Sequence, residues 1–375
     1  MTAPDSIFDD PARSCLVAMA PPDAAREAGV FRVVVACAEE AGGPVGLDWT
    51  ARTVAPDEVA IRGDAAGAYL CARIDLLLRS NGITAVVLAP DLPPALRGNL
   101  AARCRMLGYA VATPERLDAV LSAWTSAGAG PRGWHAEAKA AALLPDLESR
   151  IAPGRAALLL IDVQNDFCLR EGLVGRNGDQ ITLLDQTVPR LRALLASARA
   201  AGVLVVHVRA EYGQVFRNAG SPYRFPVAGR REPAVWTASA GEAGDGPGFG
   251  ADEVEVCRKD SWGGEFVAGM EPAPGEPVIV KHRYSAFRDT GLDVLLRANG
   301  IRTLVVGGVT TNCCVESTVR EAAMRDFYVV VAEDCVAVKD KIADLHAASL
   351  EAQGLYFALL RPLGELRTAW GLPPC

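Results

Sequence analysis

The stretch LVVGGVTTNCCVESTVR, residues 304–320, predicts one strand–loop–helix unit. Its apolar start is typical of a buried strand, its Gly/Thr centre of a loop, and its end of a helix that opens at Cys313 and Cys314. The first turn of a helix offers N–H groups and the positive end of the helix dipole, which favour a thiolate. A free cysteine is usually a small buried hydrophobe, but one at a strand-to-helix junction is a candidate nucleophile.

Two other strand ends carry charged side chains. The stretch ALLLIDVQNDF (157–167) is a buried-strand pattern that ends at Asp162, and PVIVKHRYSAF (277–287) is a strand pattern that ends at Lys281. Ligands of parallel sheets bind beyond the carboxyl ends of the strands. Alone, Asp162 also fits a helix-capping residue and Lys281 a solvated strand end. With Cys314 they supply a base, a cation and a nucleophile.

Apolar runs alternate with helix-forming segments such as Leu191–Ala201 and Leu292–Ala298 along the whole chain. This alternation predicts parallel α/β sheets with right-handed crossovers. The predicted strands are Phe31–Ala36, Ala85–Ala89, Ala157–Ile161, Val203–Val208, Val278–Lys281, Thr303–Gly307 and Tyr328–Ala332.

The length of 375 residues favours two domains. The small-residue stretch TSAGAGPRG (125–133) is typical of a linker, and the helix-like segment His135–Arg150 follows it. We therefore expect an N-terminal domain at 1–124, a linker at 125–134 and a catalytic domain at 135–375.

The two parts share an internal repeat. IDLLLRSNGI (74–83) and LDVLLRANGI (292–301) are identical at seven of ten positions, at an offset of 218 residues. AREAGV (25–30) and ARAAGV (198–203) match in the same order along the chain. Similar helix–Asn-Gly–strand junctions can also arise by chance, but two ordered matches favour a shortened, diverged copy at the N-terminus.

The N-terminal copy lacks counterparts of Asp162, Lys281 and Cys314. At the same offset Cys314 faces Leu96 and Lys281 faces Gly63, and aligning the opening strands places Ala20 opposite Asp162. The N-terminal domain is therefore expected to be non-catalytic.

Composition excludes several classes of protein. A net charge of −7 and the lack of a basic run argue against nucleic acid or an anionic membrane as partner. No signal-peptide pattern or membrane-length apolar run occurs. Ten cysteines without regular spacing indicate reduced thiols and a cytoplasmic location, and four histidines without HxxxH or HxH spacing predict no metal.

These segments resemble the isochorismatase-like cysteine hydrolases. The resemblance covers residues 135–360 and implies a three-layer, Rossmann-like parallel-sheet hydrolase domain, preceded here by a shorter, diverged α/β domain of the same type. The matching segments are IDVQNDF, WGGEF (262–266), VKHRYSAF, GVTTNCCVEST and EDC (333–335).

The family pattern T-N-x-C-V implies Cys314, and not Cys313, as the nucleophile. It implies Asp162 as proton acceptor and donor, and Lys281 as the cation near both. It further implies a cis peptide bond at Val309–Thr310. The N–H groups of Thr310 and Cys314 would form the oxyanion hole.

The resemblance also implies the reaction. We expect a cysteine amidohydrolase that releases ammonia or an amine from a small amide, ureido or carbamoyl compound, without a cofactor. Metal-dependent nicotinamidases of this fold carry an Asp-x-His-x-x-x-His cluster, from which VHVRAEY (206–212) departs. Members of the family that cleave isochorismate lack the cysteine, so the presence of Cys314 indicates a reaction that cleaves a C–N bond.

Five residues are expected to bind the substrate, although the aromatic ones are equally typical of a hydrophobic core. They are Asn165, Phe167, Trp262, Tyr284 and Thr311. Arg209 and Arg283 could hold a substrate carboxylate, or form surface ion pairs instead.

The family implies a homo-oligomer, either a dimer or a tetramer. Two alternatives to the hydrolase stay open. One is a catalytically silent protein that binds or senses a small molecule with the same pocket; the complete Asp, Lys and Cys set argues against it. The other is a thiol-redox protein that uses Cys313 and Cys314, which vicinal geometry disfavours.

Overall fold

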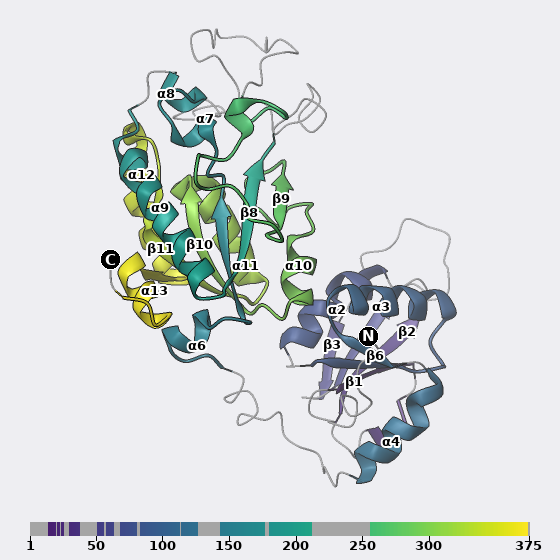
Figure 1. The fold of residues 1–375 in the computed structure, drawn as a ribbon. Coiled ribbons are helices and arrows are strands. Elements are labelled where there is room, and N and C mark those ends of the chain that lie inside the picture. Colours follow the sequence, from purple (N-terminus) through teal and green to yellow (C-terminus); the bar gives the residue numbers. More distant parts are fainter. Residues whose placement is uncertain are drawn as a thin grey trace, which may run out of the picture. The chain divides into compact units, whose positions relative to one another are not determined.

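A computed structural model gives the fold of the chain. It describes residues 14–19, 21–22, 24–25, 30–37, 51–55, 58–63, 68–80, 83–112, 114–126, 143–176, 180–211 and 256–373. The chain forms two compact units, Met1–Leu144 and Pro145–Cys375 (Figure 1). Most of the predicted linker and residues 135–142 lie outside the described residues, so the predicted boundaries stay predictions.

The second unit alternates strands and helices. Its elements are α6 (Leu147–Ile151), β7 (Ala156–Ile161), α7 (Asn165–Cys168), α8 (Leu173–Arg176), α9 (Thr182–Ala200), β8 (Leu204–Ala210), η5 (Trp262–Gly264), β9 (Val278–Lys281), α10 (Leu292–Ala298), β10 (Thr303–Val309), the π-helical turn η6 (Thr311–Val315), α11 (Glu316–Met324), β11 (Tyr328–Ala337), η7 (Asp340–Ile342), α12 (Ala343–Tyr356), β12 (Leu359–Arg361) and α13 (Leu363–Ala369).

The first unit is smaller. Its described elements are β1 (Ser14–Ala18), β2 (Phe31–Cys37), β3 (Ala51–Ala55), β4 (Glu58–Gly63), α2 (Ala68–Ser80), β5 (Ala85–Leu88), α3 (Pro94–Met106), β6 (Ala110–Ala112), η2 (Pro114–Arg116) and α4 (Leu117–Ser126).

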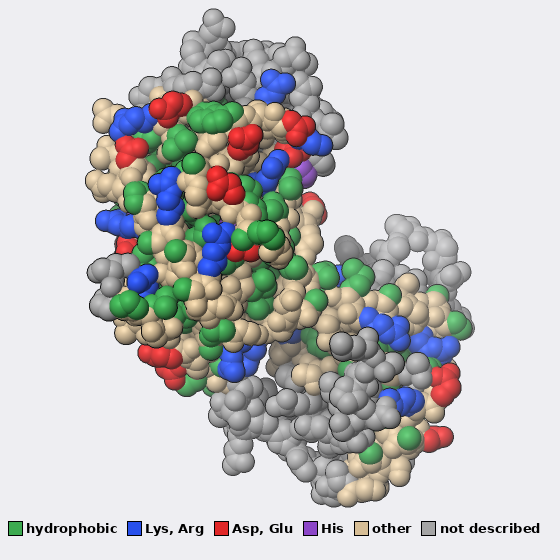
Figure 2. All heavy atoms as spheres, viewed as in Figure 1, with side chains coloured by type: hydrophobic (Ala, Val, Ile, Leu, Met, Phe, Trp, Pro, Cys, Tyr) green, Lys and Arg blue, Asp and Glu red, His purple; other side chains and the backbone are tan. Residues whose placement is uncertain are grey.

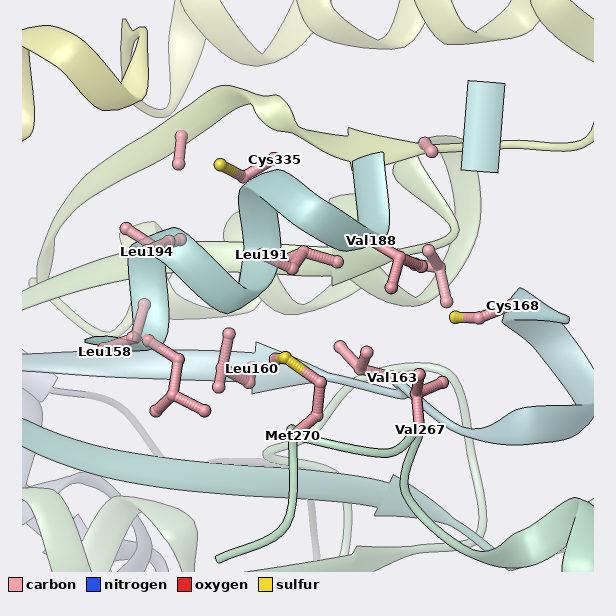
Figure 3. Packing of buried hydrophobic residues seen from close by; sticks show 14 of the residues in the cluster. Leu158, Leu160, Val163, Cys168, Val188, Leu191, Leu194, Val267, Met270 and Cys335 are labelled. Atoms are coloured by element: carbon pink, nitrogen blue, oxygen red, sulfur yellow. The ribbon is translucent and has the colours of Figure 1, made fainter. Parts of the chain in front are cut away.

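The second sheet has six strands in the order β12-β11-β10-β7-β8-β9, and every neighbouring pair is parallel. Side chains of a strand alternate between the two faces of a sheet. On one face, Leu158 and Leu160 of β7 pack with Leu191 and Leu194 of α9, as the close view in Figure 3 shows. This face is also covered by α6 and α13, which contribute buried residues to the same cluster.

The other face of the second sheet is covered by α10 and α11. Leu159 and Ile161 of β7 pack there with Leu296 of α10 and Val319 of α11, and α12 adds the partly buried Leu350. The central strands β7 and β10 are therefore buried on both faces, which explains why their sequences are continuously apolar. The predicted three-layer, parallel α/β fold is confirmed.

The first sheet has the order β3-β4-β2-β1-β5-β6. It is parallel except for the β3–β4 pair, which is antiparallel. The strands β3, β4 and β6 were not among the predicted strands. Two buried clusters, one with residues of α2 and α3 and one with residues of α4, cover the two faces.

The segment His135–Arg150 was expected to be helical, and this prediction is confirmed only at its end. Residues 147–150 belong to α6, the described residues 143–146 are not helical, and residues 135–142 lie outside the described residues. Pro145 disfavours the helical conformation of the residue before it. Asp146 then caps α6, because its Oδ1 accepts a hydrogen bond from the backbone N–H of Ser149 at 2.7 Å.

The strand registers agree with the internal repeat. In the first sheet Cys15 of β1 pairs with Val86 of β5, and in the second sheet Ala157 of β7 pairs with Leu304 of β10. Aligning β1 with β7 therefore places position 86 on position 304, which is the offset of 218 residues that the sequence match requires. Five parallel strands of each sheet also follow the same spatial order, β4-β2-β1-β5-β6 and β9-β8-β7-β10-β11.

An ion pair is repeated as well. Arg79 Nε lies 2.7 Å from Asp75 Oδ2 in α2, and Arg297 Nε lies 3.6 Å from Asp293 Oδ1 in α10. Both pairs join residues one helical turn apart, again at an offset of 218 residues. These agreements support the hypothesis that the first unit is a diverged copy of the second.

The surface of the second unit is mixed in charge. On the face shown in Figure 2, its basic and acidic side chains are interspersed with apolar ones. Within the described ranges, no helix combines the length and the apolar character that a membrane span needs.

Substituting Gly308 with alanine should destabilise the second unit. Gly308 of β10 pairs with Ile161 of β7 and has a φ of 123°. A Cβ at this position would lie 2.1 Å from the carbonyl oxygen of Ile161, so backbone must shift. We expect Gly308→Ala to lower the free energy of unfolding by more than about 3 kcal/mol in urea titrations followed by circular dichroism.

The control for this prediction is Gly364→Ala at the start of α13. No heavy atom lies within 4 Å of the Cβ that it would add. Its stability should stay within about 1 kcal/mol of the wild type. Equal stabilities for the two variants would contradict the close packing of β10 on β7.

Candidate active site

Asp162 follows the last residue of β7, a central strand of the sheet. Its side chain is fully buried, its backbone has a φ of 52°, and its N–H donates to the carbonyl of Val208 in β8 at 2.9 Å. A positive φ is uncommon for a residue other than glycine. Here it turns the chain out of the strand and leaves the carboxylate inside the unit, beyond the carboxyl end of β7.

Lys281 is the last residue of β9. Its side chain is also fully buried, unlike an ordinary strand-end lysine. The ammonium nitrogen lies 2.7 Å from Asp162 Oδ2 and 3.3 Å from Cys314 Sγ, and it also donates to the carbonyl of Arg283 at 3.2 Å. A buried ammonium needs such partners, because burying an unpaired charge is costly. Lys281 thus joins the other two predicted residues.

Cys314 lies in the π-helical turn between β10 and α11 and is 6% exposed. The turn is formed by backbone bonds to the carbonyl of Thr310, which accepts from the N–H of Cys313 at 3.0 Å and of Val315 at 3.2 Å. The hydroxyl of Thr318 donates to the Cys314 carbonyl at 2.7 Å. These bonds fix the backbone that carries the thiol.

The peptide bond Val309–Thr310 is cis, as the family resemblance implied. Thr310 directly follows this cis bond, and Cys314 lies four residues further along, in η6. The oxyanion-hole role of their N–H groups stays a prediction.

The three side chains determine one another's ionisation. The Cys313 thiol and burial raise the pKa of the Cys314 thiol, although Lys281 opposes them. Burial raises the pKa of the Asp162 carboxyl well above its usual range, against the effect of Lys281. Asp162 and Cys314 raise the pKa of Lys281 in spite of burial, so it stays an ammonium. The cluster therefore holds a cation beside an acid and a thiol that can exchange one proton.

Removing the Cys313 thiol should make Cys314 more reactive. Since Cys313 raises the pKa of the Cys314 thiol, Cys313→Ala should increase the thiolate fraction at a given pH. We expect the rate of Cys314 alkylation by iodoacetamide, followed by peptide mass spectrometry, to rise about threefold or more at pH 8. The midpoint of its pH profile should move to lower pH. An unchanged rate, or a midpoint at higher pH, would contradict a tuning effect of Cys313.

Three predicted substrate-binding residues have contacts inside the protein. Asn165 is buried, and its side-chain amide donates to the carbonyl of Trp262 at 2.7 Å. Phe167 is buried in the hydrophobic cluster on the α9 face of the sheet. Thr311 is fully buried, and its hydroxyl lies 2.8 Å from Nδ1 of His346. Their substrate contacts stay predictions.

The other two are more accessible. Trp262 is 48% exposed in the turn η5, where its carbonyl accepts from the Asn165 amide. Tyr284 is half-buried and packs against both hydrophobic clusters of the second unit. These two aromatic residues are the better candidates for contact with a substrate.

Sequence reasoning missed two buried polar residues that fix the loop after β7. The side-chain amide of Gln164 donates to the carbonyls of Ala210 and Gly264 at 3.0 and 2.8 Å. The carboxylate of Asp166 accepts from the N–H groups of Cys257 and Leu173 at 2.7 and 3.1 Å. A signal was present, since both lie in IDVQNDF (161–167), the segment that also carries Asp162.

The described histidines have neighbours within the protein. His207 Nε2 lies 2.7 Å from Glu276 Oε2, His282 Nδ1 lies 2.6 Å from the carbonyl oxygen of Glu211, and His346 contacts Thr311. In the part of the chain that the structure describes, no group of three His, Cys, Asp or Glu side chains could hold a metal ion.

The fold and this cluster define an α/β domain with a cysteine, a lysine and an aspartate gathered at the carboxyl edge of its parallel sheet. The sequence model of the isochorismatase domain matches residues 156–361. The chain therefore belongs to the isochorismatase family.

Relatives and a solved structure are similar to parts of this chain. A ureidoacrylate amidohydrolase of Variovorax paradoxus is 35% identical over 48% of this chain and 67% of its own, and one from Enterobacter sp. is 31% identical over 49% and 75%. A crystal structure of an isochorismatase family protein from Desulfovibrio vulgaris is 29% identical, covering 58% of this chain and 98% of its own at a TM-score of 0.45.

Proposed function

We propose that the second unit is a cysteine amidohydrolase that cleaves a C–N bond of a small ureido, carbamoyl or amide compound through a thioester. The chain is a hydrolase of carbon–nitrogen bonds in linear amides. One observation carries the proposal for its site: the Lys281 ammonium lies 2.7 Å from Asp162 Oδ2 and 3.3 Å from Cys314 Sγ. The names of the relatives, ureidoacrylate amidohydrolases, support a ureido or carbamoyl group as the substrate class.

The first half of the reaction forms the acyl-enzyme. Asp162 accepts the proton of the Cys314 thiol, and the thiolate attacks the carbonyl carbon of the substrate. The N–H groups of Thr310 and Cys314 hold the resulting oxyanion. The C–N bond then breaks, Asp162 gives its proton to the leaving nitrogen, and ammonia or an amine departs.

The second half hydrolyses the thioester. Asp162, again a carboxylate, accepts a proton from water, whose oxygen attacks the thioester carbonyl. The C–S bond breaks, the acid is released, and the proton returns to Cys314. Lys281 stays protonated throughout and offsets the negative charge that passes between the carboxylate and the sulfur.

The raised pKa of Cys314 fits this sequence of steps. A thiol that is protonated in the free enzyme requires a base within reach. The Lys281 ammonium, 2.7 Å from Asp162 Oδ2, opposes the burial that raises the pKa of the Asp162 carboxyl and so favours the carboxylate that acts as this base. This arrangement differs from a redox cysteine, which reacts as a preformed thiolate.

The proposal is tested by ammonia release from a panel of small ureido acids, carbamoyl amino acids and primary amides. The best substrate, mixed rapidly with the enzyme and quenched in acid, should leave an acyl adduct on Cys314 in intact-protein mass spectra. Ammonia release with the adduct on Cys314 supports the proposal. Binding of panel compounds without ammonia release would instead identify a catalytically silent binding protein.

We further propose that the first unit is non-catalytic. Gly63 at the end of β4 aligns with Lys281, and Leu96 in α3, which aligns with Cys314, is fully buried in the apolar core. Ala20, which aligns with Asp162, lies outside the described residues. A cytoplasmic homo-oligomer is the assembly that we expect, and light scattering of the whole chain measures its size.

A further inference from the structure

One face of α12 is polar where it meets the nucleophile turn η6. His346, Ser349 and Gln353 follow one another at spacings of three and four residues, so they share one side of the helix. Ser349 is 5% exposed and Gln353 is fully buried. The other buried residues on this side of the sheet form the apolar cluster of α10 and α11. Because buried polar side chains need hydrogen-bond partners, these polar side chains are expected to bind a specific polar group.

That partner is Thr311, the first residue of η6. Its hydroxyl lies 2.8 Å from His346 Nδ1. Its carbonyl oxygen lies 3.2 Å from Ser349 Oγ and accepts from Gln353 Nε2 at 3.4 Å. Gln353 Nε2 also donates to Ser349 Oγ at 2.9 Å, so the three side chains act on one residue as a connected set.

The network reaches α11 as well. Ser349 Oγ lies 2.5 Å from Glu316 Oε2, and the other carboxylate oxygen of Glu316 is held by the Arg320 guanidinium at 2.6 Å. Glu316 is the first residue of α11, directly after the turn. Side chains of α12 therefore bind both ends of the five-residue turn that carries Cys314.

We propose that His346, Ser349 and Gln353 are positioning residues for the nucleophile, which hold the turn η6 so that the sulfur of Cys314 stays beside the Lys281 ammonium. This inference rests on the proposed catalytic role of Cys314. None of the three touches the reacting atoms; they act through Thr311 and Glu316. A π-helical turn needs such help, because its backbone bonds are displaced from the usual α-helical pattern.

The burial of Gln353 allows a role in positioning the nucleophile to be distinguished from a role in stability alone. Its Oε1 is buried and has no hydrogen-bond partner among the described residues. Gln353→Met removes this unsatisfied acceptor, which is favourable, together with the two hydrogen bonds that Nε2 donates, which is unfavourable, so its net effect on stability should be small. If Gln353 served only stability, Gln353→Met should therefore be harmless to activity.

The experiment compares the wild-type chain with Gln353→Met, His346→Leu and His346→Asn. His346→Asn keeps a polar atom near the position of Nδ1. The matched control is Gln186→Met, the same chemical change at an exposed position of α9. For each, kcat and KM are measured with the best panel substrate, together with the rate of Cys314 alkylation by iodoacetamide and the midpoint temperature of unfolding.

We expect Gln353→Met to lower kcat about tenfold or more while KM changes less than about twofold, because a small displacement of a reacting group mainly affects the chemical step. Alkylation of Cys314 should slow in parallel, since the sulfur moves away from Lys281, and the unfolding midpoint should change little. His346→Leu should also lower kcat, and His346→Asn should restore at least half of the loss. Gln186→Met should behave as the wild type.

Wild-type kcat and alkylation rates in Gln353→Met would overturn the inference, as would a loss of kcat that only follows the folded fraction. The alkylation rate does not depend on turnover. If Cys314→Ser kept full activity, the proposed function would fail, whereas the alkylation rate would still report whether α12 places the sulfur.

Discussion

Cys314→Ser is expected to lower kcat for ammonia release by at least about 10⁴-fold, or about 5 kcal/mol of transition-state stabilisation. A serine hydroxyl is a far weaker acid than a thiol, so a buried carboxyl such as Asp162 cannot generate its anion. The side chains are similar in size and the site is 6% exposed, so the fold should persist. Steady-state ammonia release and the circular dichroism spectrum measure the two effects separately.

Cys313→Ser is the matched control, because it makes the same chemical change one residue earlier in the same turn. It should keep at least about a tenth of the wild-type kcat, since it removes only a group that tunes the nucleophile. The reverse result, in which Cys313→Ser is inactive and Cys314→Ser is active, would exclude Cys314 as the nucleophile. Residual activity in Cys314→Ser would also mean that another part of the chain, such as the first unit, has catalytic residues.

Much of the fold follows from local patterns. The apolar runs at β7, β10 and β11 are continuous because these strands are buried on both faces, and a continuous run flanked by helices predicts a parallel sheet. The antiparallel strand β3 gave no such signal, because an edge strand is set by its single neighbour β4. The described start of α6 shows the same limit: helix formers dominate the sequence before it, but residues 143–146 are not helical, because Pro145 disfavours the helical conformation of the residue before it.

The site could be predicted from the sequence because its residues lie at or just after the ends of predicted strands. Asp162, Lys281 and Cys314 all lie at carboxyl ends of one parallel sheet, which brings them to one edge. The burial of Lys281 could not be predicted, because β9 is an edge strand whose Val278 and Val280 are exposed while Lys281 is not. Its environment is made by loops distant in sequence. The contacts of α12 with Thr311 likewise depend on packing between elements that local spacing does not describe.

Asp162→Asn is expected to lower kcat about 10³- to 10⁴-fold, because the amide cannot accept the thiol proton. It should also destabilise the second unit by about 3 kcal/mol or more, since it leaves the fully buried Lys281 ammonium without its counterion. In this variant the pKa of Lys281 should fall below its unfolded value. Folded Lys281 would then bind fewer protons than unfolded Lys281, so the variant should gain stability relative to the wild type as the pH rises from 7 toward 10.

The double variant Asp162→Asn, Lys281→Met separates the two effects. It removes the buried charge, and replacing a buried ion pair by apolar or neutral groups is often neutral for stability. We expect urea titrations at pH 7 to show stability restored to within about 1 kcal/mol of the wild type, with kcat as low as in Asp162→Asn. A double variant that regains activity would contradict a catalytic role of the carboxylate. A single variant as stable as the wild type at pH 7 would show that Lys281 does not need Asp162 as its counterion.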